Sequence, residues 1–235
     1  MIRLGVLGSD GKMGGLVCAL SASGYSSRVD VRTKADRSGG DLAALLDVDA
    51  VIDFSAPEAS TALADLALAR GPVRLPVFVV GTTGWRPGDM DRLTGLSKIT
   101  PVLVSSNFSP AIWAMNEMLR TASRALLGLG YVPAMVERHH IRKKDAPSGT
   151  ALGLERAVYP DGKKMKIESI RNGETVGDHE LIFEGAHDSI MLAHHAKDRA
   201  VFARGAIEAA IWCHGNRSRA GRLLSMDDFM REGMK

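Results

Sequence analysis

The sequence predicts an α/β protein with two domains, and three features carry this prediction. Over the first half of the 235 residues, short apolar runs alternate with helical patterns, as in a parallel sheet that helices cover on both faces. The first of these runs leads directly into a glycine-rich turn. After residue 130 the order changes to strand, helix and three consecutive strand-like stretches, which is typical of an α+β domain with a mixed sheet.

Composition narrows the range of functions. A formal net charge of +3 is too small to indicate nucleic-acid binding, although it permits acidic small-molecule ligands. No apolar run approaches the length of a membrane span and no signal-peptide pattern is present, so we expect a cytoplasmic protein that does not bind membranes. Cys18 and Cys213 lie far apart in apolar helical stretches, which favours two buried thiols over a disulfide.

The first domain is expected to contain a doubly wound parallel sheet. Its strands are predicted at residues 2–7, 29–33, 50–54, 77–80 and 101–104, with a short helix at 41–48 and a helix at 57–69 that begins with Pro57. Alternating strands and helices require right-handed crossovers. Ligands of such sheets bind beyond the carboxyl ends of the strands, where the polar clusters 81–84 and 105–108 lie.

The glycine-rich turn at residues 8–14 has the spacing G-x-x-G-x-x-G between a strand and a helix, which is the context of a Rossmann-like dinucleotide site. Glycines would let the backbone approach a pyrophosphate at the helix start. Many strand-to-helix turns are glycine-rich for steric reasons alone, so the turn by itself is a weak signal. The carboxylate of Asp10 must point away from any phosphate, because it would otherwise weaken binding.

Asp36 and Arg37 follow the second strand, where dinucleotide folds read the adenosine ribose. A carboxylate there can bind the ribose hydroxyls of NADH, and a guanidinium can bind the 2′-phosphate of NADPH. The alternative is a solvated loop, given the charged neighbours Arg32 and Lys34.

The second domain is expected to begin with an amphipathic helix at 110–127, for which the apolar pattern gives the core candidates Trp113, Met115, Met118, Leu119 and Leu126. A strand at 132–136, a helix at 150–158 and strands at 166–171, 180–184 and 189–194 follow, then a helix at 200–213 and a short closing element at 223–230.

Residues 136–151, V-E-R-H-H-I-R-K-K-D-A-P-S-G-T-A, hold the strongest candidate site. Neighbouring strand residues point to opposite faces, so His139 and His140 can share a cavity only where the strand ends. Lys143 and Lys144 lie in a loop, and Pro147 then opens a helix whose free N–H groups can bind an anion. This combination suits a small, multiply negative substrate that must gain a proton. The alternative is a partly exposed histidine pair beside solvated lysines.

The pattern E-x-H-H-x-x-K-x-D-A-P-S-G-T-A resembles the signature of the 4-hydroxy-tetrahydrodipicolinate reductase (dihydrodipicolinate reductase) family of lysine and diaminopimelate biosynthesis. The glycine turn with Lys12-Met13-Gly14, the G-T-T-G at 81–84, the S-x-N-F at 105–108 and the segment 171–179 are similar as well, so the resemblance extends from residue 2 to about 229. It implies an NAD(P)H-dependent oxidoreductase that reduces 4-hydroxy-tetrahydrodipicolinate, a dicarboxylate, to tetrahydrodipicolinate as a homotetramer.

The resemblance also implies roles for individual residues. His139 would be the general acid and Lys143 a proton donor and charge partner, while the substrate carboxylates would be bound by His140, Lys144, Ser148, Gly149 and Thr150. NADPH or NADH would be bound by Gly8, Ser9, Asp10, Gly11, Lys12, Met13, Asp36, Arg37, Gly81, Thr82, Thr83, Ser105, Ser106, Asn107 and Phe108. Residues 1–108 and 200–235 would form the dinucleotide-binding domain, and residues 109–199 the substrate-binding and oligomerisation domain.

Other interpretations were weighed against this one. A metal site at the second doublet, His194-His195, is not expected, because adjacent strand residues diverge and neither cysteine has zinc-site spacing to it. A different dehydrogenase, of the aspartate or homoserine type, would lack the histidine-lysine run. A non-catalytic dinucleotide sensor would have no need for His139, Lys143 and the helix start together. The chain is shorter than the family between residues 37 and 50 and between 159 and 164, which leaves the choice between NADH and NADPH open.

Overall fold

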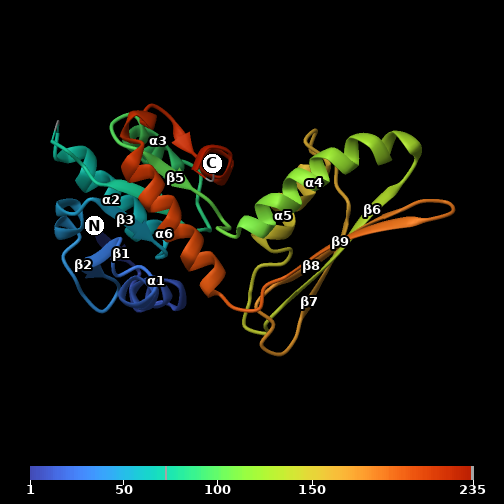
Figure 1. Cartoon of the computed structure of the whole chain (residues 1–235), viewed down its shortest axis with the longest axis horizontal. Helices are drawn as coiled ribbons and strands as arrows, with labels where there is room; N and C mark the ends of the chain where they lie inside the picture. The colour runs from blue at the N-terminus through green and yellow to red at the C-terminus, as the bar shows by residue number, and fades with distance from the viewer. Residues whose placement is uncertain (72, 234–235) are drawn as a thin grey trace. The chain divides into compact units, whose positions relative to one another are not determined.

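The structure is a computed structural model that describes residues 1–71 and 73–233. The chain forms two compact units, one made of Met1–Phe108 with Ala200–Lys235 and the other of Ser109–Arg199 (Figure 1). Each unit has its own sheet and its own helices.

The first unit contains a six-stranded sheet in which every pair of neighbours is parallel, in the order β10-β5-β4-β3-β1-β2. Its strands are β1 (Ile2–Leu7), β2 (Val29–Ala35), β3 (Ala50–Asp53), β4 (Val77–Val80), β5 (Val102–Val104) and β10 (Leu223–Leu224). All four residues of β3 and of β4 are buried, as expected of central strands that helices cover on both faces. The predicted doubly wound parallel sheet is confirmed.

The helices of this unit form two groups. Helix α1 (Lys12–Ser23) packs against α6 (Ala200–Gly215), and α2 (Pro57–Ala69) packs against α3 (Asp89–Ser97). Right-handed crossovers from a strand order that reverses at β1 place α1 on one face and α2 with α3 on the other, and α6 joins α1. The remaining helices are the 3₁₀ turns η1 (Ala43–Asp47) and η3 (Arg217–Arg219) and the helix α7 (Met226–Gly233), which packs on α6.

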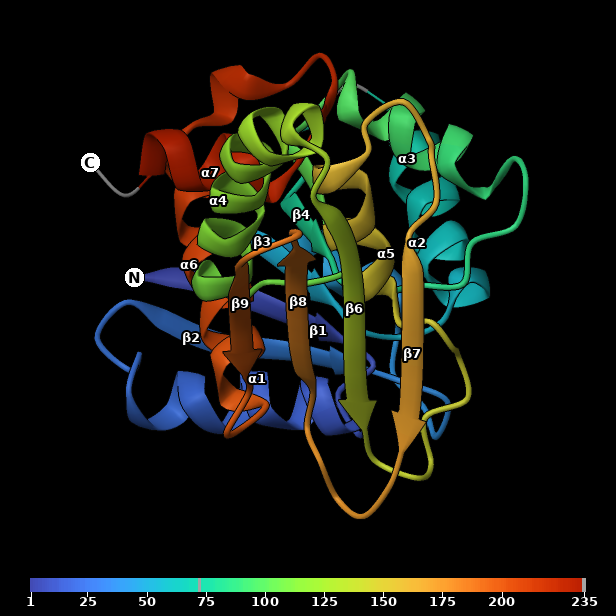
Figure 2. The same cartoon turned by 90° about the vertical axis from the view of Figure 1, so that its right-hand side faces the viewer.

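The second unit contains a mixed four-stranded sheet, seen face-on in Figure 2, in the order β7-β6-β8-β9. Its strands are β6 (Val132–His139), β7 (Lys166–Arg171), β8 (Asp178–Glu184) and β9 (Ser189–His195). Strands β6 and β7 are parallel, and the other pairs are antiparallel. This second domain is the α+β arrangement predicted from its run of strands.

Two helices cover one face of this sheet. Helix α4 (Pro110–Leu126) begins with Ser109, whose hydroxyl accepts the N–H of Ile112, and runs into the turn η2 (Leu127–Leu129). Helix α5 (Gly149–Val158) lies beside it. The core between helices and sheet is formed by apolar side chains from α4, β6, α5 and β8, among them Leu119, Met135, Leu154, Leu181 and Phe183.

Several details differ from the sequence prediction. Helix α3 was not predicted, β2 continues to Ala35 and β6 to His139, and the closing element divides into β10 and α7. Met118 is 52% exposed and is therefore wrong as a core residue, because the buried stripe of α4 runs through Ile112, Met115 and Leu119. Both cysteines are free, as predicted, but Cys18 is only partly buried. None of the described helices combines the length and the hydropathy needed to cross a membrane.

Candidate active site

The end of strand β6 brings a buried histidine together with a buried carboxylate. His139 is the last residue of the strand and Glu137 lies two positions earlier, so both side chains point to the helix-covered face. The alternation predicted for the doublet holds, because His139 is buried whereas the next residue, His140, is partly exposed. Nδ1 of His139 lies 2.8 Å from Oε2 of Glu137, whose side chain is fully buried.

The sheet register adds a cation and a second imidazole to this pair. Arg171 on β7 lies opposite His139, and His179 on β8 lies opposite Glu137. Arg171 donates from Nη2 to Oε1 of Glu137 at 2.7 Å, and the N–H of Ser148 donates to the same oxygen at 3.1 Å. His179 packs edge-on to His139, with 5.3 Å between the ring centroids.

Burial and neighbouring charges shift the pKa of each group. Burial alone would raise the pKa of Glu137, but the N–H of Ser148 and the guanidinium of Arg171 outweigh it and lower that pKa to about 2. Burial lowers the pKa of His139 to about 4; Glu137 opposes this effect, while Lys143 and Arg171 reinforce it. Burial likewise lowers the pKa of His179 to about 3. The cluster therefore holds one ionised carboxylate and two histidines that are neutral at pH 7.

Three of these residues were absent from the predicted site. Glu137 belonged to the quoted motif, and its i, i+2 spacing from His139 on a strand could have paired the two side chains from sequence alone. Arg171 and His179 are distant in sequence and reach the site only through the register of β7 and β8 with β6. The pattern within each segment carries no signal for that register.

The loop after β6 carries the predicted lysines. Lys143 is partly buried, and its Nζ lies 2.8 Å from Oδ1 of Asp145. The backbone carbonyl of Asp145 accepts from Arg171 at 2.6 Å, which ties this loop to the buried cluster. Lys144 is exposed. The loop thus places one ammonium group close to the cluster and leaves the other in solvent.

Helix α5 begins at the predicted position. Ser148 is its N-cap, and the hydroxyl oxygen accepts the N–H of Ala151 at 3.1 Å. Ser148 is buried, and both its hydroxyl and its N–H are bonded within the chain. Gly149 and Thr150 form the first turn and are partly exposed. The N–H and the hydroxyl of Ser148 are therefore not open to an anion at this helix start.

The glycine-rich turn of the first unit is shaped by close backbone approach. Gly8 adopts φ +83°, and a Cβ there would lie 2.6 Å from the carbonyl oxygen of Phe54. A Cβ at Gly14 would lie 2.1 Å from the carbonyl oxygen of Gly8. Gly11 is the N-cap of α1, and Lys12 and Met13 are its first two residues. Glycine is therefore required at positions 8 and 14 for the backbone of the turn to pack closely against the segment after β3 and the start of α1.

A cavity of about 740 Å³ lies beside this turn. It is lined by the turn, by the segment after β2 and by the segment after β3, with contributions from Gly8, Asp10, Gly11, Asp36, Arg37, Ser38, Phe54, Ser55 and Glu58. Its size suits part of a dinucleotide, and the side chains predicted to read the ribose, Asp36 and Arg37, both line it.

Asp36 is held in place by hydroxyl groups. Ser38 donates to Oδ1 of Asp36 from its N–H and from its hydroxyl, both at 2.7 Å, and Ser9 donates to Oδ2 at 2.9 Å. These bonds, those of Ser38 first, lower the pKa of Asp36 strongly. Asp10 accepts from the Ser38 hydroxyl at 3.1 Å, so a local hydrogen bond engages its carboxylate. Arg37 is exposed.

The ends of β3, β4 and β5 meet around a buried aspartate. Asp53 accepts hydrogen bonds from the Ser55 N–H at 2.9 Å, the Thr82 hydroxyl at 2.9 Å and the Ser60 hydroxyl. The Thr82 side chain therefore faces Asp53, while Thr83 is exposed. A Cβ at Gly81 would overlap the ring of Phe54.

The segment after β5 completes this group of strand ends. Phe108 packs edge-on to Phe54, with ring centroids 5.8 Å apart, and is buried. Asn107 donates its N–H to the Ser105 hydroxyl at 3.2 Å, and Ser106 is exposed. The predicted cofactor residues of these segments thus lie together at the carboxyl ends of β4 and β5. The side chains of Thr82 and Phe108 are buried there.

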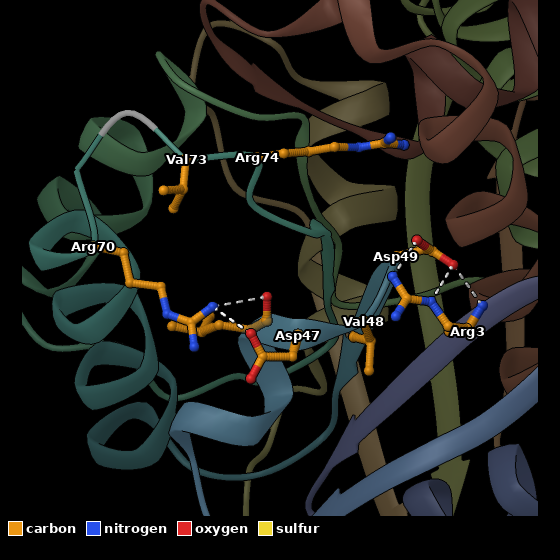
Figure 3. A pocket seen from close by; sticks show the side chains of 8 residues that line it. Arg3, Asp47, Val48, Asp49, Arg70, Val73 and Arg74 are labelled. Atoms are coloured by element: carbon orange, nitrogen blue, oxygen red, sulfur yellow. Dashed lines mark hydrogen bonds and ion pairs between the residues drawn. The ribbon is translucent and has the colours of Figure 1, made fainter.

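A second hollow of the first unit, of about 580 Å³, lies at the opposite, amino-terminal end of β1 and β3 (Figure 3). Arginines line it, but Arg3 is paired with Asp49 at 3.0 Å and Arg70 with Asp47 at 2.7 Å. These pairs neutralise two of the three guanidinium groups among the described residues that line the hollow, the third being that of Arg74, and we assign this hollow no ligand.

Two family models of known proteins together match most of the chain. Residues 2–108 match the family model for the dihydrodipicolinate reductase N-terminus, and residues 111–230 match that for the dihydrodipicolinate reductase C-terminus. The chain belongs to the dihydrodipicolinate reductase family. The resemblance inferred from the histidine-lysine motif is confirmed.

Relatives within this family cover nearly the whole chain. The 4-hydroxy-tetrahydrodipicolinate reductase of Caulobacter vibrioides is 35% identical over 243 residues, which span 91% of this chain and 92% of the relative. That of Gluconobacter oxydans is 35% identical and covers 97% of each chain.

Solved structures share the fold at lower identity. The dipicolinate-bound dihydrodipicolinate reductase of Paenisporosarcina sp. TG-14 has a TM-score of 0.72 at 19% identity, with 96% of this chain and 97% of that chain covered. A probable dehydrogenase from Thermotoga maritima has a TM-score of 0.63 at 12% identity, covering 97% of this chain and 92% of that one.

Proposed function

We propose that this protein is a 4-hydroxy-tetrahydrodipicolinate reductase, which uses NADH or NADPH to form tetrahydrodipicolinate in lysine and diaminopimelate biosynthesis. The observation that carries the proposal is the buried His139–Glu137 pair beside Lys143 and the start of α5, within the family's histidine-lysine motif. Family membership over both units supports the same reaction.

The residues of the first unit fit a dinucleotide. Gly8 and Gly14 permit the close backbone packing that brings the turn to the start of α1, whose N–H groups could bind a pyrophosphate, and the cavity beside the turn offers Asp36 and Arg37 to the ribose. We assign this cofactor role to the predicted residues of the turn, of the segment after β2 and of the ends of β4 and β5. The bound nicotinamide would supply the hydride.

Residues of the second unit would donate the proton and bind the substrate. Reduction of a cyclic imine conjugated with carboxylates leaves an electron-rich carbon that must be protonated. His139 is the proposed general acid, a role that contributes about 10²–10⁴-fold to rate. Its ring is neutral at pH 7 in the free protein, so the two carboxylates of the bound substrate would have to raise its pKa for it to carry this proton. Lys143 would stabilise the developing negative charge and serve as charge partner for the substrate.

The carboxylates of the substrate would be bound at the rim of the buried cluster. We assign this role to His140, Lys144 and the first-turn N–H groups of Gly149 and Thr150, which are partly or fully exposed. Ser148 supports this site from inside, because its polar groups cap α5 and bind Glu137.

A coupled assay tests the reaction. The preceding synthase would generate the substrate in the cuvette while the loss of NADPH absorbance is followed. Substrate-dependent oxidation of NADPH is the expected result, with dipicolinate competing with the substrate and not with NADPH. Oxidation that does not depend on the synthase product would contradict the proposed function.

Assembly through the second sheet is part of the proposal. The face that α4 and α5 leave uncovered carries the apolar row Ala134, Ile182 and Met191, which lie opposite one another on β6, β8 and β9. Met191 is 58% exposed, and Val132 on the same face is 64% exposed. Such a face favours a second copy as its cover, and we propose a homotetramer. Light scattering at micromolar concentration should give four times the chain mass; a monomer would contradict it.

We also propose that the protein works in the reducing environment of the cytoplasm. Both cysteines are free, which suits a compartment that keeps thiols reduced.

A further inference from the structure

Glu137 occupies a position that neither the motif nor the proposed reaction explains by itself. It is a fully buried carboxylate on the strand that presents His139. We propose that Glu137 is a positioning residue that holds the proton of His139 on Nδ1, so that Nε2 is the atom at which the imidazole gains and loses its catalytic proton. The inference rests on the proposed function, in which His139 supplies a proton.

The carboxylate is anchored through one oxygen and offers the other. Oε1 accepts from Arg171 at 2.7 Å and from the N–H of Ser148 at 3.1 Å. Oε2 faces Nδ1 of His139 at 2.8 Å. Arg171 is in turn fixed by donating to the Asp145 carbonyl at 2.6 Å. Glu137 therefore has no freedom to turn away from the imidazole.

This arrangement decides which nitrogen carries hydrogen. An ionised carboxylate has no proton of its own, so a hydrogen on Nδ1 makes the 2.8 Å contact with Oε2 attractive, whereas the opposite tautomer would make it repulsive, although the two atoms do not meet as an aligned hydrogen bond. In the neutral ring Nε2 is then unprotonated, and any added proton goes to Nε2. The charged groups around the ring come from every neighbouring element: Glu137 on β6, Arg171 on β7, His179 on β8, and Lys143 with Asp145 in the loop.

The second imidazole does not compete for Glu137. Nε2 of His179 lies 4.0 Å from Oε2 of Glu137, beyond hydrogen-bond range, and 3.3 Å from the hydroxyl oxygen of Ser148. That oxygen already accepts the N–H of Ala151, so its hydrogen is free to be donated to His179. The polar contact of His179 is thus with Ser148, and Glu137 serves His139.

Space is left at the other side of the ring. A Cβ at Gly177 would lie 3.0 Å from Nε2 of His139 and 3.3 Å from Cδ2. Glycine at this position therefore adds no side chain beside Nε2, although His139 as a whole is buried.

A metal ion is the competing interpretation of the same cluster. Glu137, His139 and His179 each offer a ligand atom, and these atoms lie within 4.8 Å of one another. The guanidinium of Arg171, 2.7 Å from the same carboxylate, and the ammonium of Lys143 oppose a divalent cation there. These two positive charges favour a proton between Glu137 and His139 over a bound metal ion.

Glu137→Gln gives the sharpest test, because the structure dictates how the amide must lie. Arg171 and the Ser148 N–H are both donors, so the amide oxygen takes the place of Oε1 and the NH₂ group faces Nδ1 of His139. The variant should shift the ring to the Nε2–H form. ¹⁵N NMR of histidine-labelled full-length protein should show Nδ1–H for His139 in the parent and Nε2–H in the variant.

Activity should follow the tautomer. With the wrong nitrogen protonated, kcat/KM should fall about 10²–10⁴-fold while the dissociation constant of NADPH is unchanged. Glu174→Gln, which removes an exposed carboxylate paired with Arg142, is the matched control and should change neither the spectrum nor kcat/KM.

The possible results distinguish failure of the inference about Glu137 from failure of the proposed function. An Nε2–H ring in the parent protein overturns the inference even if the variant fails to fold, as does a variant that keeps Nδ1–H. Histidine signals that shift on adding Zn²⁺ alone, with loss of the Nδ1 proton at micromolar metal, would favour the metal interpretation and overturn ours. A correct tautomer switch in a protein without reductase activity would leave the inference standing and refute the proposed function.

Discussion

Replacing Glu137 by alanine tests how completely the cluster at the end of β6 is buried. The substitution leaves the guanidinium of Arg171, with 16% of its side chain exposed, and the buried N–H of Ser148 without their carboxylate. Removing one partner of a buried ion pair costs about 3–5 kcal/mol, mainly because the other charge stays buried and uncompensated. We therefore expect the free energy of unfolding of the Ser109–Arg199 unit to fall by about that amount.

The matched control lies in the same unit. Glu174 pairs with Arg142 through both carboxylate oxygens, whereas Glu137 meets Arg171 through one, and the side chains of Glu174 and Arg142 are 71% and 54% exposed. Exposed pairs contribute about 0–1 kcal/mol, so Glu174→Ala should be nearly neutral. The double variant Glu137→Leu with Arg171→Met removes both charges and should lose less than Glu137→Ala does.

Urea denaturation at pH 7, followed by far-UV circular dichroism and by amide hydrogen exchange in β6 and β8, measures these differences. Comparable m-values for the parent and the variants would show that the change lies in stability and not in the extent of unfolding. Equal losses for Glu137→Ala and Glu174→Ala would refute the description of Glu137 as the buried centre of the site.

Three further predictions concern the substrate, the cofactor and pH. Lys143→Ala should weaken dipicolinate binding by about 1.5–3 kcal/mol, measured by calorimetry, because a hydrogen bond to a charged group is lost; unchanged affinity would contradict its role. Arg37→Ala should reduce use of NADPH and spare NADH, and Asp36→Ala should do the reverse, as ratios of kcat/KM would show; identical ratios would exclude this turn as the ribose reader. The pKa values of His139 and His179, about 4 and about 3, lie below the ordinary 6.5, so the stability they contribute is complete above pH 6.5. The free energy of unfolding, measured by urea denaturation, should therefore fall as pH drops from 6.5 towards 4, by up to about 1.4 kcal/mol per pH unit for each histidine; a constant value over this range would contradict the burial of both rings.

The parallel sheet could be predicted because its strands are continuous apolar runs and its turns are marked by glycine and proline. The strand 77–80 and the helix 57–69 agree with β4 and α2 at both ends. Helix α3 was missed because Asp89–Ser97 is short and polar, with Leu93 and Leu96 as its buried apolar side chains. A segment with so few apolar positions has no clear helical period.

Only part of the candidate site could be predicted from the sequence, because local patterns do not show which strands pair. His139, Lys143 and Ser148 lie within one short stretch, so local spacing revealed them. Arg171 and His179 join them through strand pairing between segments more than thirty residues apart, which local pattern does not determine. The tie between Asp10 and Ser38 also depends on a contact between two loops.

The central claim, that His139 delivers the proton, is tested most directly by comparing the parent protein with His139→Gln in the coupled reductase assay. Glutamine can still occupy the buried position but cannot carry a transferable proton near neutral pH. The account predicts that kcat falls about 10²–10⁴-fold while the dissociation constant of NADPH, measured separately by fluorescence titration, stays the same. A variant that turns over at the parent rate, or one that loses NADPH binding instead of turnover, would contradict it.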